Sequence, residues 1–199
     1  MITPAQILEF WFPADQDRAN ALWWGKDEAL DTEVRERFGS TLAAARDGAL
    51  DHWAETARGR VALIIVLDQL SRNIFRGDPE TYAADEQARA LALAGLERGH
   101  DRELSAMQRM FFYMPLEHSE SLADQERCVE LMGALANEVA ADPAADPALR
   151  ESFAVVVDFA IRHRDIVARF GRFPHRNALL GRASTPAELE FLTQPNSSF

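Results

Sequence analysis

The pattern of hydrophobic and polar positions is helical over most of the chain, and no series of alternating strand segments is present. This pattern predicts an all-α fold. We expect helices from Pro4 to before Pro13 and at about Asp15 to Trp24, Glu28 to Leu50, Arg58 to Phe75, Tyr82 to Arg98, Glu103 to Tyr113, Ser121 to Val139, Pro147 to Phe170, Pro174 to Leu180 and Pro186 to Leu192. Antiparallel pairs with short connections are the economical packing, so we expect a compact array of helical hairpins, a bundle or short superhelix of about 8–10 helices.

The helix expected from Arg58 is apolar on all sides between Val61 and Leu67. Only a helix that is surrounded by others tolerates such a pattern. A buried parallel strand is the competing interpretation of this run, but the lack of other strand segments argues against it. We therefore expect this helix at the centre of the fold.

Helix starts are marked by local capping signals. Thr3 precedes Pro4 and is followed three positions later by Gln6, and Thr185 stands in the same relation to Glu188. The segment 140–147 is the one clear linker, in which Asp146 is placed to cap the helix that Pro147 begins.

Composition narrows the class of protein. The 199 residues, 47% of them hydrophobic, suffice for one domain over residues 1–199. A net charge of −11 disfavours nucleic acid and anionic membrane partners. The chain opens without a leader pattern, and its longest apolar run, Val61 to Leu67, is far too short to span a bilayer. With a single cysteine, Cys128, on an apolar helical face, we expect a cytoplasmic protein with an unreactive thiol.

The positive charge is concentrated in one place. Between Arg162 and Arg182 there are six arginines and one acid, Asp165, which gives a formal charge of +5 in an acidic chain. Within it, the run Phe170 to Asn177 follows neither a helical nor a strand period. Such a cationic island is typical of an anion site or of an internal hub of ion pairs.

Two other peptides also carry unusual chemistry. In the segment Leu67 to Gly77, the spacing of four between Asp68, Arg72 and Arg76 places them on one helical face. In the segment Phe111 to Glu120, we expect Pro115 to break a helix, and the cluster of Glu117, His118, Ser119 and Glu120 follows it. This cluster is suited to holding an arginine, binding a metal or supplying a general base.

Taken in their order along the chain, the segments 67–77, 111–120 and 170–177 resemble the motifs of the bacterial family catalogued as domain of unknown function 924. The resemblance extends from the aromatic triplet Phe10, Trp11 and Phe12 to Phe191 and Leu192. It implies an all-helical, tetratricopeptide-like fold, and it supplies no reaction, cofactor or catalytic residue. The chain departs from the family pattern at Leu70 and Ser71, where members resemble Phe-Pro, so we expect the helix to continue smoothly there.

Two interpretations of the island stay open. In the first, the arginines at 169, 172, 176 and 182 pair internally with acids such as Asp68, Glu117, Glu120 and Asp165. In the second, some guanidinium groups line a groove and hold a carboxylate or phosphate. The candidate ligand-binding residues are Arg72, Asn73, Arg76, Glu117, His118, Glu120, Arg169, Arg172, His175, Arg176, Asn177 and Arg182.

Catalytic and cofactor signals are weak by comparison. His118 and His175 lie in non-helical peptides beside charges, but no His-x-x-x-His or cysteine pair anchors a metal. No phosphate loop, dinucleotide fingerprint or serine elbow is present, so we expect neither metal nor cofactor.

Our interpretation is a binding module with an Arg/His-lined groove for an acidic small molecule or peptide end. The alternative is a small hydrolase or lyase that uses His118 with Glu117 or Glu120. The sequence gives no indication of oligomeric state.

Overall fold

The structure, a computed structural model, describes residues 2–198, and every regular element in this range is helical. The all-α prediction is therefore confirmed, while the tetratricopeptide-like arrangement stays a prediction. The chain divides into two compact units, unit 1 ending at Pro115 and unit 2 beginning at Leu116. The boundary lies inside one helix, α7 (Ala106–Glu117).

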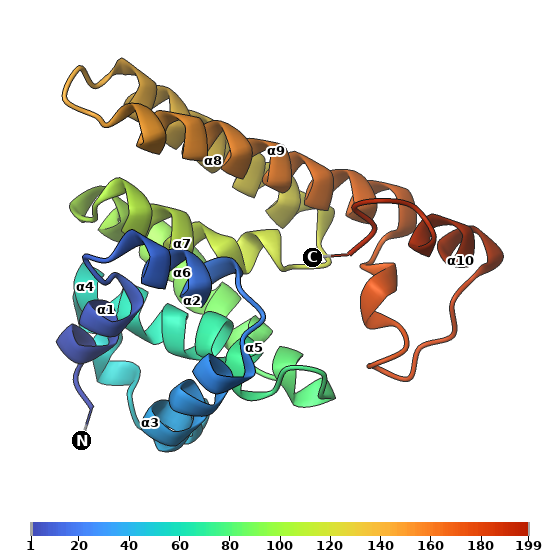
Figure 1. Ribbon diagram of the computed structural model, residues 1–199, viewed down its shortest axis with the longest axis horizontal. Helices are drawn as coiled ribbons and strands as arrows, with labels where there is room; N and C mark the ends of the chain where they lie inside the picture. The colour runs from blue at the N-terminus through green and yellow to red at the C-terminus, as the bar shows by residue number, and fades with distance from the viewer. Residues whose placement is uncertain (1, 199) are drawn as a thin grey trace. The chain divides into compact units, whose positions relative to one another are not determined.

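Unit 1 holds the larger share of the helices (Figure 1). They are α1 (Pro4–Trp11), α2 (Gln16–Trp24), α3 (Glu28–Arg46), η1 (Asp51–Glu55), α4 (Ala57–Ile64), η2 (Ile65–Leu70), α5 (Ser71–Ile74), η3 (Pro79–Tyr82), α6 (Asp85–Glu97), η4 (His100–Glu103) and most of α7. Of these, η2 is a π-helix, and η1, η3 and η4 are short 3-10 helices.

The core of unit 1 is built around α4, η2 and α5, which form one uninterrupted helix. All residues from Val61 to Leu67 are buried, and α1, α3 and α6 pack against this helix. The central position predicted from its apolar sequence is confirmed. The helix also continues through Leu70 and Ser71, as expected, although six residues of it are π-helical.

Unit 2 contains a long helical hairpin and a short terminal helix. Its elements are α8 (Leu122–Ala141), α9 (Pro147–Phe170), η5 (Pro174–Arg176) and α10 (Pro186–Leu192). Figure 1 shows α8 and α9 side by side as an antiparallel hairpin. Gly171, at φ 69°, ends α9 in the left-handed conformation that favours glycine. Turns then lead to α10, and the apolar contacts of this part join Ile166, Val167 and Phe173 to Phe170 and Phe191.

The predicted caps are present. Thr3 and Thr185 each form a capping box with the residue three positions later, Gln6 and Glu188. Asp146 accepts a hydrogen bond from the N–H of Ala148 at 2.8 Å. Local polar signals thus located these helix starts correctly.

Several predicted boundaries are wrong. The helix expected to end at Leu50 ends at Arg46, and the helix expected from Tyr82 starts at Asp85. Pro115 does not break its helix, because it lies in the last turn of α7, where only one hydrogen bond is lost before the helix ends at Glu117. The same helix starts at Ala106 rather than Glu103, because Ser105 and Gln108 bond each other's backbone N–H groups as a cap. The helix expected over Pro174 to Leu180 is only the 3-10 turn η5 followed by further turns.

Within residues 2–198, no helix has both the length and the hydropathy that a bilayer crossing needs.

Candidate functional site

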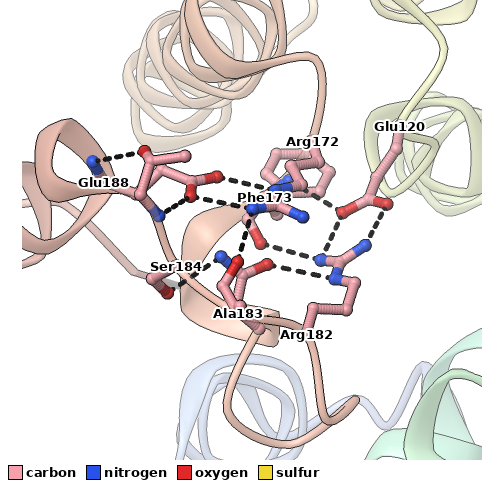
Figure 2. A network of polar contacts seen from close by, with 9 residues as sticks. Glu120, Arg172, Phe173, Arg182, Ala183, Ser184 and Glu188 are labelled. Atoms are coloured by element: carbon pink, nitrogen blue, oxygen red, sulfur yellow. Dashed lines mark hydrogen bonds and ion pairs between the residues drawn. The ribbon is translucent and has the colours of Figure 1, made fainter.

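Two bidentate ion pairs hold the segment between α9 and α10. Arg182 donates from Nη1 and Nη2 to the carboxylate oxygens of Glu120, at 2.6 and 2.9 Å. Arg172 donates from Nε and Nη2 to those of Glu188, at 2.6 and 2.8 Å. Figure 2 shows each guanidinium group facing its carboxylate, with Phe173 between the two pairs. The α7–α8 connection and α10 are both tied in this way to one segment.

Backbone groups complete this network. The Phe173 N–H donates to Glu120 Oε1 at 2.7 Å, and the Phe173 carbonyl accepts from Arg182 Nη2 at 3.1 Å. Asn177 accepts from Arg182 Nε at 3.0 Å and donates to Ser184 Oγ at 3.0 Å. The pairing of Arg182 with Glu120, which the internal-hub interpretation contains, is therefore present.

The acids of the network are held in their ionised form. Hydrogen bonds from Arg172 and from the backbone N–H of Thr185 lower the pKa of Glu188, a residue only 2% exposed, to about 2. Burial raises the pKa of Glu120, but the hydrogen bonds from Arg182 and from a backbone N–H outweigh burial, so its pKa lies below the ordinary value. Both carboxylates are charged at neutral pH.

Imidazole and guanidinium groups gather around the ring of Phe173. The rings of His163 and His175 each lie 5.6 Å from it, centroid to centroid, and the guanidinium of Arg176 lies over it at 4.6 Å. The ring of His118 is 6.4 Å from that of His163. The cluster of His118, His163, His175 and Arg176 is called the histidine cluster below.

The histidine cluster combines a buried ring with half-buried ones. His163 is 4% exposed, and its Nδ1 lies 2.9 Å from the carbonyl oxygen of Phe159 and 3.3 Å from Glu117 Oε1. Burial, together with the electrostatic effect of neighbouring side chains, lowers the pKa of His163 to about 3, although the hydrogen bond to the Phe159 carbonyl acts in the other direction. Burial, followed by the charge of Arg176, lowers the pKa of the half-buried His175 to about 4. Both imidazoles are therefore neutral at pH 7.

The candidate residue Arg72 lies in unit 1, where it contacts carboxylates. Its Nη1 is 3.1 Å from an oxygen of Asp68 and 3.1 Å from one of Asp85. Asp68 is fully buried in the π-helical segment, and its carbonyl also accepts from Arg72 at 2.6 Å. Burial alone would lower the pKa of the Arg72 guanidinium, but these two acids raise it above its usual value.

Asn73 and Arg76 share a second carboxylate in unit 1, that of Asp31. Arg76 donates from Nε and Nη2 at 2.5 and 2.9 Å, and Asn73 donates from Nδ2 at 2.9 Å. Although burial raises the pKa of Asp31, these hydrogen bonds lower it below the ordinary value. The segment Leu67 to Gly77 is thus joined to α3 by an ion pair and hydrogen bonds.

Several of these contacts were not found by sequence reasoning. Arg169 lies over the rings of Phe170 and Phe191, at 4.7 and 5.7 Å, rather than beside an acid. The sequence marks Glu188 only as a cap residue, and His163 has no signal of its own because it lies in the middle of a helix. The acids Asp31 and Asp85 have no local pattern that marks them, because their partners are distant in sequence.

Other site types have less support among the described residues. In the range 2–198 no group of three or more His, Cys, Asp or Glu side chains is arranged to hold a metal ion. Two surface hollows of about 400 and 360 Å³ lie in unit 1. None of the twelve candidate residues lines either hollow, so these two do not supply the groove expected from the sequence.

A family model matches most of the chain. Residues 7–196 match DUF924, a family described as bacterial protein of unknown function. A solved structure, that of protein of unknown function ATU0120 from Agrobacterium tumefaciens, is similar with 39% sequence identity and a TM-score of 0.79. The similarity covers 95% of this chain and 96% of that one. No curated protein matches the chain. The chain therefore belongs to the DUF924 family of bacterial proteins of unknown function.

Proposed function

We propose that this protein is a binding module that holds the anionic group of an acidic small molecule or peptide end at the histidine cluster of unit 2. The observation that carries the proposal is the convergence of His163, His175 and Arg176 on the ring of Phe173. Imidazole N–H groups and a guanidinium are the donors that carboxylates and phosphates accept from. The half-buried position of His118 and His175 leaves part of each ring accessible to a ligand.

The charges around His175 also favour an anion. Burial is the largest cause that lowers its pKa, Arg176, His118 and Arg182 act in the same direction, and Glu120 acts in the other. Because the carboxylate of Glu120 is already held by both terminal nitrogens of Arg182, its charge is largely neutralised. A ligand with a negative charge would find a cationic environment there.

The enzymatic alternative, a hydrolase or lyase using His118 with Glu117 or Glu120, has less support. The Glu120 carboxylate accepts hydrogen bonds from Arg182 and from the backbone of Phe173. Glu117 is buried, with its carboxylate 3.3 Å from the buried His163. These contacts already use the two carboxylates that would have to orient His118 as a general base.

Ligand-dependent thermal stability tests the proposal. At constant ionic strength set with chloride, saturating sulfate, phosphate or succinate should raise the melting temperature by roughly 5 to 10 °C at about a hundred times the dissociation constant. Arg176→Ala should remove this shift. The matched control is Arg169→Ala, which removes an exposed arginine from aromatic rings of the same unit and should leave the shift intact.

An internal hub would give the opposite pattern. Arg176→Ala would then lower the free energy of unfolding by roughly 3 to 5 kcal/mol without any ligand, because it would leave a buried carboxylate unpaired. Anions would have no effect on the melting temperature of the parent protein. That pair of results would refute the binding function.

A further inference from the structure

We infer that a surface hollow of unit 1 binds a free α-amino acid with an apolar side chain. The hollow has a volume of about 360 Å³ and is lined by residues of α1, of the α1–α2 connection, of α2 and of α3. Those that carry the argument are Glu9, Phe10, Pro13, Arg18 and Arg37. The histidine cluster belongs to unit 2, so this inference does not depend on the proposed function.

Two guanidinium groups are fixed at the wall of the hollow by one carboxylate. Arg18 donates from Nη2 to both oxygens of Glu33, at 3.0 and 3.1 Å, and Arg37 donates from Nη1 to Glu33 Oε1 at 2.7 Å. The Cζ atoms of Arg37 and Arg18 also lie 4.5 and 5.6 Å from the centroid of the Phe10 ring, which holds cations by its π face. Because both side chains are already oriented, a ligand loses less affinity to their ordering.

This pairing leaves donors for a ligand. No described residue accepts a hydrogen bond from Nε or Nη2 of Arg37, or from Nε or Nη1 of Arg18. A guanidinium can bind a carboxylate bidentately through Nε and Nη2, and Arg172 binds Glu188 in this protein by that edge. Two cations also share the single charge of Glu33, which leaves one positive charge for the carboxylate of a ligand.

Glu9 supplies the opposite charge in the same hollow. It is exposed, and no described residue forms a hydrogen bond or an ion pair with its carboxylate. The charges of Glu9 and Glu33 together balance those of Arg18 and Arg37, so a simple anion would gain no net attraction. A molecule that carries both an ammonium and a carboxylate matches the two unused charges, and this match makes the hollow selective.

The rest of the wall is suited to an apolar body. Ile2, Phe10 and Pro13 line the hollow beside the charged groups. Small-molecule sites typically combine such an apolar wall with a few polar groups that fix orientation. An α-amino acid carries its carboxylate, its ammonium and its side chain on one carbon, so an apolar one uses all three parts of this wall.

Titration of the full chain with L-phenylalanine, followed by heteronuclear NMR, measures both the affinity and the position of binding. Phenylpropionate lacks the ammonium, and phenylethylamine lacks the carboxylate. We expect L-phenylalanine to shift the amide signals of residues that line the hollow. Each analogue should bind about tenfold more weakly or worse, because one hydrogen-bonded charge is lost.

Variants at exposed positions test the two charged contacts. Arg37→Lys keeps the positive charge but not the two-donor edge, so it should weaken L-phenylalanine binding by about tenfold. The matched control is Arg127→Lys, which changes an exposed arginine paired with Glu130 in α8 and should bind as the parent does. Glu9→Gln should lose the preference for L-phenylalanine over phenylpropionate, because the group that favours the ammonium is removed.

Contrary results are equally specific. Absence of shifts at about 10 mM L-phenylalanine, where a site with a dissociation constant of about 1 mM is nearly full, would overturn the inference. Shifts confined to residues outside the hollow, or equal affinity of the parent for L-phenylalanine and phenylpropionate, would do the same. Unchanged affinity in Arg37→Lys would overturn the assignment of the carboxylate to Arg37. None of these results bears on the histidine cluster, which sulfate and Arg176→Ala test separately.

Discussion

The buried imidazole of His163 makes the stability of the protein sensitive to acid. Its pKa is about 3 in the folded chain and about 6.5 when unfolded, so the unfolded chain takes up a proton first as the pH falls. The contribution of the neutral His163 to the free energy of unfolding is therefore fully present above about pH 6.5, and it is lost as the pH falls from that value to about 3. His175 adds the same effect down to about pH 4. Each histidine should lower the free energy of unfolding by about 1.4 kcal/mol per pH unit in its window.

Urea unfolding in chloride buffers between about pH 7 and pH 5 measures this slope. His163→Gln should make the slope shallower by about 1.4 kcal/mol per pH unit, because one of the two titrating groups is removed. His52→Gln, at an exposed position in η1, is the control and should leave the slope unchanged. An unchanged slope in His163→Gln would show that this ring does not stay neutral in the folded protein.

Single residues differ in how far the sequence alone reveals them. Cys128 was placed on an apolar helical face, and it is fully buried, as that pattern predicts. Burial and then Glu117 raise the pKa of its thiol well above the ordinary value, so slow reaction with thiol reagents stays our prediction. His163 could not be found in this way, because its ring partner Phe173 comes from a segment without any period.

At the scale of elements, the fold of α10 depends on Glu188. This carboxylate accepts from Arg172 and also from the N–H of Thr185, so it serves the ion pair and the helix cap together. Glu188→Gln retains an oxygen for the cap but removes the charge that the guanidinium needs. We expect amide hydrogens of α10 to exchange roughly tenfold faster in this variant, since hydrogen bonds to charged partners are the stronger ones.

Hydrogen exchange followed by mass spectrometry resolves this change. The control is Glu190→Gln, which removes the same charge from an exposed position of the same helix. It should leave exchange in α10 close to that of the parent. Equal acceleration in both variants would mean that helix charge matters here and that the contact with Arg172 does not.

Elements were predictable where their ends carry polar caps. The capping boxes of Thr3 and Thr185 and the cap at Asp146 placed three helix starts correctly. The start of α7 was missed although Ser105 and Gln108 have the same spacing, so that signal was present in the sequence. The ion pair between Glu120 and Arg182 joins residues 62 positions apart, and no local pattern indicates such a contact.

At the scale of the whole molecule, one helix crosses the boundary between the two units. Unfolding of either unit alone would break hydrogen bonds of α7 near Pro115. We therefore expect one cooperative transition, in agreement with the single domain predicted from chain length. Calorimetry tests this, because the calorimetric and van't Hoff enthalpies agree for a two-state transition. Two separate heat-absorption peaks would contradict it.

The π-helical turn of the central helix has a consequence for comparing relatives. Its hydrogen bonds reach five residues back instead of four, so the segment from Ile65 to Leu70 takes up one residue more than an α-helical turn. The helical period of the residues after this segment, such as Arg72 and Arg76, is therefore offset by about one residue from the period of the residues before it, such as Val61. A relative that lacks one residue in this stretch would form a regular α-helix there and keep its later side chains on the same faces of the helix. Alignments of this segment should therefore allow a one-residue gap between the apolar run and the ionic motif.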